Sequence, residues 1–170
     1  MTAHDANRIV LIGVGNPWRG DDGVGRVVVE AAAAGLVDAE VIESDGEPAR
    51  LVDAWTGAGV AVVVDAVRSG APPGTVHTWA GEAALPVAPA SPGTHALGVA
   101  EAIALGRAVG RLPRRLVVVG IEAAETSAGQ GLSPPVTDAV ATAAEVVVAS
   151  CRFEGGAGVG FDGLAGVEPG

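Results

Sequence analysis

The chain contains three short apolar runs, each of which predicts a buried β-strand. They are Ile9 to Val14, Val60 to Val64 and Leu116 to Ile121. Continuous apolar runs of this length are typical of parallel strands that helices cover on both faces. A further strand is expected at Ala39 to Glu43, closed by the Asp45-Gly46 turn. The alternating segment Thr75 to Trp79 predicts a half-exposed edge strand that could run antiparallel.

Segments with helical spacing lie between these strands. The first helix is marked by apolar residues that recur on one helical face: Val24, Val27, Val28, Ala31 and Ala32. Further helices are expected from Glu47 to Trp55, from Thr94 to about Val109, and from Ser133 to about Ser150. The alternation of strands and helices predicts a three-layer α/β/α sandwich around a mainly parallel, five-stranded twisted sheet.

The length of 170 residues is enough for one domain with a substantial core. The 26 glycines and 11 prolines predict many turns. We expect a single domain over residues 1–152 and a flexible, glycine-rich tail over residues 153–170, because the tail offers little apolar surface to bury.

Two features of the composition exclude whole classes of chemistry. All ten basic residues are arginine, so a Walker-type phosphate loop and a Schiff-base lysine are both ruled out. Cys151 is the only cysteine, which excludes an internal disulfide, a cysteine-based zinc site and an iron–sulfur cluster built by this chain alone. We expect Cys151 to be a small buried residue near a helix end.

The net charge of −10 disfavours nucleic acid as a partner, since it repels the phosphate backbone. The first residues contain no apolar signal-peptide core, and acidic residues or prolines interrupt the long apolar runs. We therefore expect a cytoplasmic protein that binds neither nucleic acid nor a membrane. A monomer is expected, and a dimer stays open.

Ligands of open parallel sheets bind beyond the carboxyl ends of the strands. Asp21 and Asp22 follow the first strand, Asp65 follows the run Val60 to Val64, and His95 lies in the first turn of a helix. The dipole of that helix disfavours the imidazolium, and a neutral imidazole is the form that binds a metal. Two carboxylates and one imidazole would leave a coordination position open for water or substrate, as catalytic metal sites do.

These candidates also have structural interpretations. Asp22 could cap the helix that follows it, and Asp65 could accept hydrogen bonds from amides of the next loop. Four other titratable residues are weaker candidates: His4, His77, Glu122 and Glu125. The two histidines are expected at the surface, and the two glutamates could support the site or be solvated loop charges. A nucleotide-binding or phospho-acceptor site is disfavoured, because Trp18 stands where a dinucleotide fingerprint needs glycine and no lysine is present.

Seven segments, taken together and in order from about Ile9 to Val148, resemble the [NiFe]-hydrogenase maturation proteases. They are Gly13-Val14-Gly15-Asn16, Asp21-Asp22-Gly23-Val24-Gly25, Val63-Val64-Asp65-Ala66, Pro73-Gly74-Thr75, Ser91 to Gly98, Val118-Val119-Gly120-Ile121 and Gly131-Leu132-Ser133-Pro134. Members of that family are endopeptidases that remove a C-terminal extension from the hydrogenase large subunit once nickel has been inserted.

The resemblance implies that nickel binds to Asp22, Asp65 and His95, that another divalent ion such as zinc could replace it, and that the partner is the large-subunit precursor. Relatives often carry glutamate at the first position, so the shorter Asp22 would hold the ion closer or through a bridging water. Which of Asp21 and Asp22 is the ligand stays open. Four residues are implied at the substrate cleft: Gly15, Asn16, Asp45 and Gly46. Whether the nickel resides in the protease or arrives with the precursor is also open.

The implied metal could polarise the scissile carbonyl and lower the pKa of a bound water from about 16 towards 7, with Asp21 or a displaced carboxylate taking the proton. Covalent catalysis is disfavoured, because Ser91 and Ser133 have no paired base in sequence and Cys151 lies away from the strand ends. The rival hypothesis is a non-catalytic, metal-sensing or chaperone-like protein that binds the same precursor.

Overall fold

The computed structural model describes residues 5–80, 95–124, 129 and 131–152, without the side chains of residues 95–97. The strands are β1 (Asp5–Val14), β2 (Ala39–Ser44), β3 (Ala58–Val67), β4 (Val76–Ala80) and β5 (Arg115–Glu122). The helices are the short 3-10 helix η1 (Gly20–Gly23) and α1 (Val24–Ala33), α2 (Pro48–Trp55), α3 (His95–Ala108) and α4 (Pro134–Arg152). The expected tail over residues 153–170, His4, Ser91, Thr94 and Glu125 lie outside the described residues.

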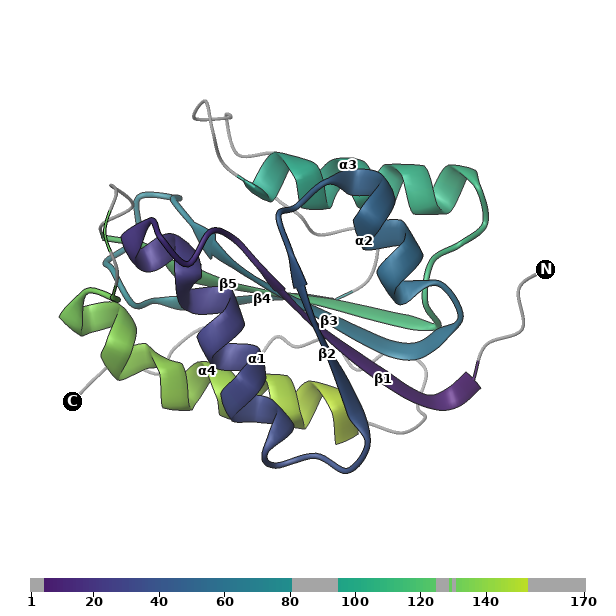
Figure 1. Cartoon of the computed structure of the whole chain (residues 1–170), viewed down its shortest axis with the longest axis horizontal. Coiled ribbons are helices and arrows are strands. Elements are labelled where there is room, and N and C mark those ends of the chain that lie inside the picture. Colours follow the sequence, from purple (N-terminus) through teal and green to yellow (C-terminus); the bar gives the residue numbers. More distant parts are fainter. Residues whose placement is uncertain (1–4, 81–94, 125–128, 130, 153–170) are drawn as a thin grey trace.

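The five strands form one sheet in the order β2-β1-β3-β5-β4. All neighbours pair in parallel except β4, which pairs antiparallel with β5 at the edge. Helices α1 and α4 lie against one face of the sheet, and α2 and α3 lie against the other (Figure 1). The predicted α/β/α sandwich and the antiparallel edge strand are therefore confirmed.

Two apolar cores fill the spaces between the sheet and its helical layers. Alternate residues of β3 enter opposite cores: Val62 and Val64 pack with α1 and α4, whereas Ala61 and Val63 pack with α2 and α3. This two-sided burial explains why β3 has a continuous apolar run instead of an alternating pattern.

The expected apolar face of α1 is only partly correct. Val28 and Ala32 are buried as predicted, whereas Val27 is 38% exposed and Ala31 is exposed. Val29, which the pattern did not include, is fully buried. Valine and alanine occupy several neighbouring rows of this helix, so hydrophobicity alone could not determine which row faces the sheet.

Candidate functional site

Close backbone contacts bring the start of α1 to the carboxyl ends of β1 and β3. A Cβ atom added to Gly25 would overlap the carbonyl oxygens of Val14 and Val64, so only glycine permits this approach. η1, which carries Asp21 and Asp22, directly precedes α1 and also contacts β3. The loop after β1 thus lies against the strand that carries Asp65, as the topology predicted.

The start of α3 reaches the same edge of the sheet through a second glycine contact. A Cβ atom on Gly98 would overlap the carbonyl oxygen of Gly46, whose φ of 86° favours glycine. The end of β2 is in turn joined to the loop after β1, because the amide of Gly15 donates to the carbonyl of Ser44 at 3.0 Å. The first turn of α3, which begins at His95, therefore packs on the Asp45-Gly46 turn.

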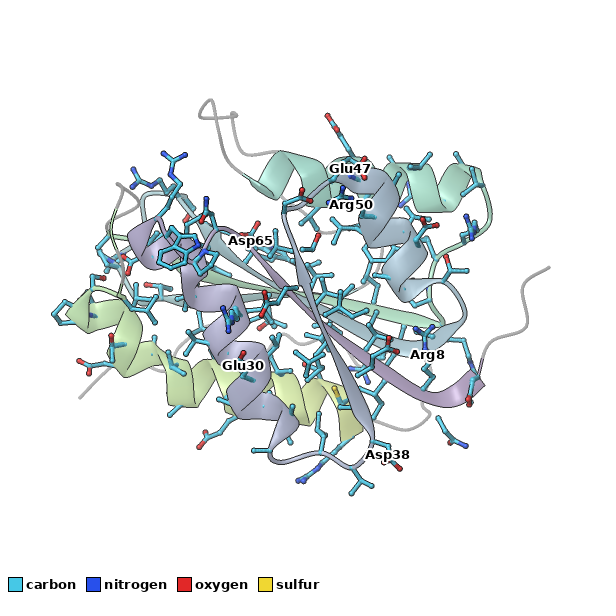
Figure 2. The ribbon with its side chains drawn as sticks, viewed as in Figure 1. Arg8, Glu30, Asp38, Glu47, Arg50 and Asp65 are labelled. Carbon is cyan, nitrogen blue, oxygen red and sulfur yellow. The ribbon has the colours of Figure 1, made fainter. Side chains whose placement is uncertain are left out.

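Asp65 lies inside β3 and not after it, because the strand continues to Val67. On one side, Asp65 pairs with Gly120 of β5. On the other side, the pairing of β3 with β1 ends one residue earlier, at Val64 and Gly13. Asp65 is 2% exposed. Figure 2 shows that it lies towards one end of the sheet, whereas Arg8 lies towards the other end. A carboxylate buried this deeply must be paired, hydrogen-bonded or bound to a metal.

Asp22 is half-buried in the loop that joins β1 to α1. Its Oδ2 accepts a hydrogen bond of 2.8 Å from the amide of Asn16. The interpretation of Asp22 as the helix cap is wrong, since Gly23 occupies the N-cap position of α1 and no side chain caps that helix. η1 separates the strand from α1, and the carboxylate of Asp22 folds back on its own loop instead. Gly15 permits this fold, because a Cβ there would overlap the carbonyl oxygen of Asp22.

Asp21 has a different environment from its neighbour, since it is fully buried. Its Oδ1 accepts from the amide of Ser133 at 2.7 Å, and its Oδ2 accepts from the Ser133 hydroxyl and the Ala124 amide, both at 2.8 Å. One carboxylate therefore joins η1, the end of β5 and the start of α4. This bridge could not be predicted from local sequence, because the hydrogen-bond donors are more than 100 residues from Asp21.

Glu122 is buried and holds the loop that follows β3. Its carboxylate accepts from the amide of Ser69 at 2.7 Å, from the Ser69 hydroxyl at 2.8 Å and from the amide of Gly70 at 3.1 Å. His77 lies 3.2 Å from the same carboxylate and stacks on Trp79. His77 is partly exposed, as expected for a surface residue, but it also contacts a buried carboxylate, which the sequence did not predict. The antiparallel pairing of β4 with β5 brings His77 close to Glu122. The register of this pairing could not be predicted from the sequence.

Cys151 is buried in α4, as expected, and burial raises the pKa of its thiol to about 11. At neutral pH the thiol is therefore protonated and weakly nucleophilic. We expect alkylation by iodoacetamide to be slow at pH 7 and to accelerate about tenfold per pH unit until the pH approaches that value. If the chain is the endopeptidase that the resemblance implies, we expect Cys151→Ser to change its cleavage rate by less than about twofold, in assays run side by side with the wild type. A rate loss of 100-fold would show that the thiol takes part in the reaction.

Among the side chains that the structure describes, no group of three His, Cys, Asp or Glu residues could hold a metal ion. The side chain of His95 lies outside that set, so the three-residue ligand set stays a prediction. The same described residues include no helix that is both long enough and apolar enough to cross a membrane.

Comparisons with known proteins give a consistent result. A family profile described as hydrogenase maturation protease (HycI) matches residues 27–150, a range that includes Asp65 and His95 but begins after Asp22. The hydrogenase expression/formation protein HupD of Thiocapsa roseopersicina is 29% identical over 145 residues, which cover 82% of this chain and 66% of HupD. The hydrogenase 2 maturation protease of Escherichia coli is 28% identical over 152 residues, which cover 87% of this chain and 93% of that protein.

Solved structures show the same likeness. The hydrogenase maturating endopeptidase HybD of E. coli superposes with a TM-score of 0.71 at 27% identity, covering 85% of this chain and 92% of HybD. The [NiFe] hydrogenase maturation protease HybD of Thermococcus kodakarensis gives a TM-score of 0.61 at 26% identity, covering 82% and 95% of the two chains.

Proposed function

Because the chain belongs to the hydrogenase maturation protease family, we propose that it is an endopeptidase that removes the C-terminal extension of a [NiFe]-hydrogenase large-subunit precursor after nickel insertion. The observation that carries this proposal is the meeting of four segments at one edge of the sheet. They are the loop between β1 and α1 that carries Asp22 (the Asp22 loop), the part of β3 that carries Asp65, the Asp45-Gly46 turn and the first turn of α3. Carboxyl edges of this kind are where α/β proteins bind their substrates.

Asp22, Asp65 and His95 are the residues that would hold the Ni²⁺ that the precursor carries. Carboxylate oxygens and an imidazole nitrogen are a suitable donor set for nickel, and zinc could replace it. Asp22 is a better ligand than Asp21, because both oxygens of Asp21 already accept hydrogen bonds from Ser133 and Ala124. We therefore propose Asp22, and not Asp21, as the first carboxylate ligand.

The residues of this chain would act by positioning the precursor and by accepting a proton. Gly15, Asn16, Asp45 and Gly46 lie at the same edge and would border the extension. When bound, the ion supplies Lewis-acid polarisation of the scissile carbonyl. Asp22 is half-buried, whereas Asp21 and Asp65 are at most 2% exposed. The proton from an attacking water would go to Asp21 or to a carboxylate displaced from the ion, and among the two proposed carboxylate ligands Asp22 is the more accessible for such a displacement. A precursor without nickel would lack the ion that these side chains recognise.

The test is to mix the purified protein with nickel-loaded precursor and to measure the mass of the product. We expect the precursor to lose a C-terminal peptide, and nickel-free precursor to stay intact. A stable complex whose mass does not change would contradict the proposal and support the rival hypothesis of a non-catalytic, metal-sensing or chaperone-like binder.

A further inference from the structure

The loop of residues 16–19, here called the Trp18 loop, carries the most exposed aromatic side chain among the described residues. Trp18 is 62% exposed, whereas Trp55 is fully buried and Trp79 is partly buried. Tryptophan is mostly buried in folded proteins, because it has a large apolar surface. The exposed indole of Trp18 is therefore an apolar surface that a partner could bury.

The exposure of Trp18 does not come from a loop without contacts. The Trp18 amide donates to the Asn16 side chain at 2.9 Å, and its carbonyl accepts from the Gly129 amide at 2.9 Å. The Arg19 amide donates to the carbonyl of Asn16 at 3.1 Å, and the Gly20 amide donates to the carbonyl of Gly129 at 2.8 Å. The backbone on both sides of Trp18 is thus held by hydrogen bonds, and the loop presents an exposed indole from a defined backbone position.

The Trp18 loop is also directly connected to Asp22. The amide of Asn16 donates to the Asp22 carboxylate, and the amide of Asp22 donates to the carbonyl of Arg19 at 3.1 Å. Trp18 lies in the sequence between Asn16 and Arg19, the two residues that bond to Asp22. A large protein that places a group at Asp22 must therefore meet Trp18 with the surface around that group.

We propose that Trp18 is a docking anchor that inserts into an apolar pocket on the folded body of the large-subunit precursor. This inference rests on the proposed function, because it takes the same precursor as the partner. Tryptophan and arginine are the residue types most enriched where interfaces gain most of their affinity, and Arg19 is the exposed neighbour of Trp18. A rigid anchor also loses little conformational entropy on binding.

The test compares Trp18→Ala with Val37→Ala. Val37 is 84% exposed but lies in the turn between α1 and β2, at the amino end of β2 and away from the site. We expect Trp18→Ala to raise the Kd and the KM for nickel-loaded precursor at least about tenfold with little change in kcat. We expect Val37→Ala to change neither, and Trp18→Phe to recover part of the affinity. Circular dichroism melting confirms that each variant is folded.

A second measurement follows the indole itself. In the wild type, acrylamide should quench Trp18 fluorescence strongly in the free protein and much less in the complex, and Trp18→Ala should lose this difference. If the wild type cleaves the precursor and the two alanine variants bind it equally well, the docking role is wrong and the proposed function stands. If Trp18→Ala instead abolishes self-association of this chain, Trp18 is a dimer contact and the docking role is also wrong. If the wild type neither binds nor cleaves the precursor, both proposals fail.

Discussion

Asp65→Asn is expected to reduce cleavage of nickel-loaded precursor by at least about 100-fold while the protein stays folded. Asparagine has nearly the volume of aspartate, and the change removes a charge from a residue that is only 2% exposed, so the packing of β3 is preserved. It also removes a negatively charged oxygen donor from the predicted nickel site. The measurements are product mass for cleavage, calorimetric titration with Ni²⁺ for binding, and circular dichroism melting for the fold.

The matched control is Asp53→Asn on α2, whose side chain is 71% exposed and lies 3.4 Å from Arg111. An exposed ion pair of this kind contributes little to stability, so we expect neither the cleavage rate nor the melting temperature to change measurably. His95→Ala should behave like Asp65→Asn if both residues hold the same ion. An Asp65→Asn protein that cleaves at the wild-type rate would remove this residue from the site.

The layers of the fold could be predicted from the sequence because its strands are buried on both faces. The Val60 to Val64 run of β3 and the Leu116 to Ile121 run of β5 are continuous apolar segments, which are typical of strands covered on both faces. The strand ends were less predictable. β3 continues through Asp65 to Val67, because pairing with β5 continues there, and pairing is a property of two segments.

The candidate site could be predicted only as far as topology determines it. Parallel strands bring their carboxyl ends together, so the meeting of the Asp22 loop, Asp65 and the start of α3 follows from the element order. Side-chain hydrogen bonds do not follow from it. The Asp21–Ser133 pair spans 112 residues and Glu122–Ser69 spans 53. Neither pair has a local pattern that distinguishes it from solvated acidic residues, so these contacts required coordinates.

Asp21→Asn is expected to lower the free energy of unfolding by about 2–4 kcal/mol. The Asp21 carboxylate accepts three hydrogen bonds from Ser133 and Ala124 while fully buried. An asparagine side chain has one oxygen for these three donors, and its NH₂ group would face an N–H or O–H that needs an acceptor. Denaturation in urea measures the loss. Asp138→Asn, at an exposed position of α4, is the matched control and should change the stability by less than about 0.5 kcal/mol.

The same variant separates a structural Asp21 from a catalytic one. At a temperature where the variant is still folded, we expect its cleavage rate to stay within about tenfold of the wild type, since the Asp21 carboxylate accepts structural hydrogen bonds from Ser133 and Ala124. Removal of a proton acceptor would instead lower the rate by about 10² to 10⁴ without a large change in stability.

Ser133→Ala should lower the free energy of unfolding by about 1–2 kcal/mol, because it removes one of the three donors to the Asp21 carboxylate. The double variant should lose less than the sum of the two single changes, because both disrupt one hydrogen-bond network. A stable but inactive Asp21→Asn protein would return Asp21 to the reacting groups and reopen the choice between Asp21 and Asp22.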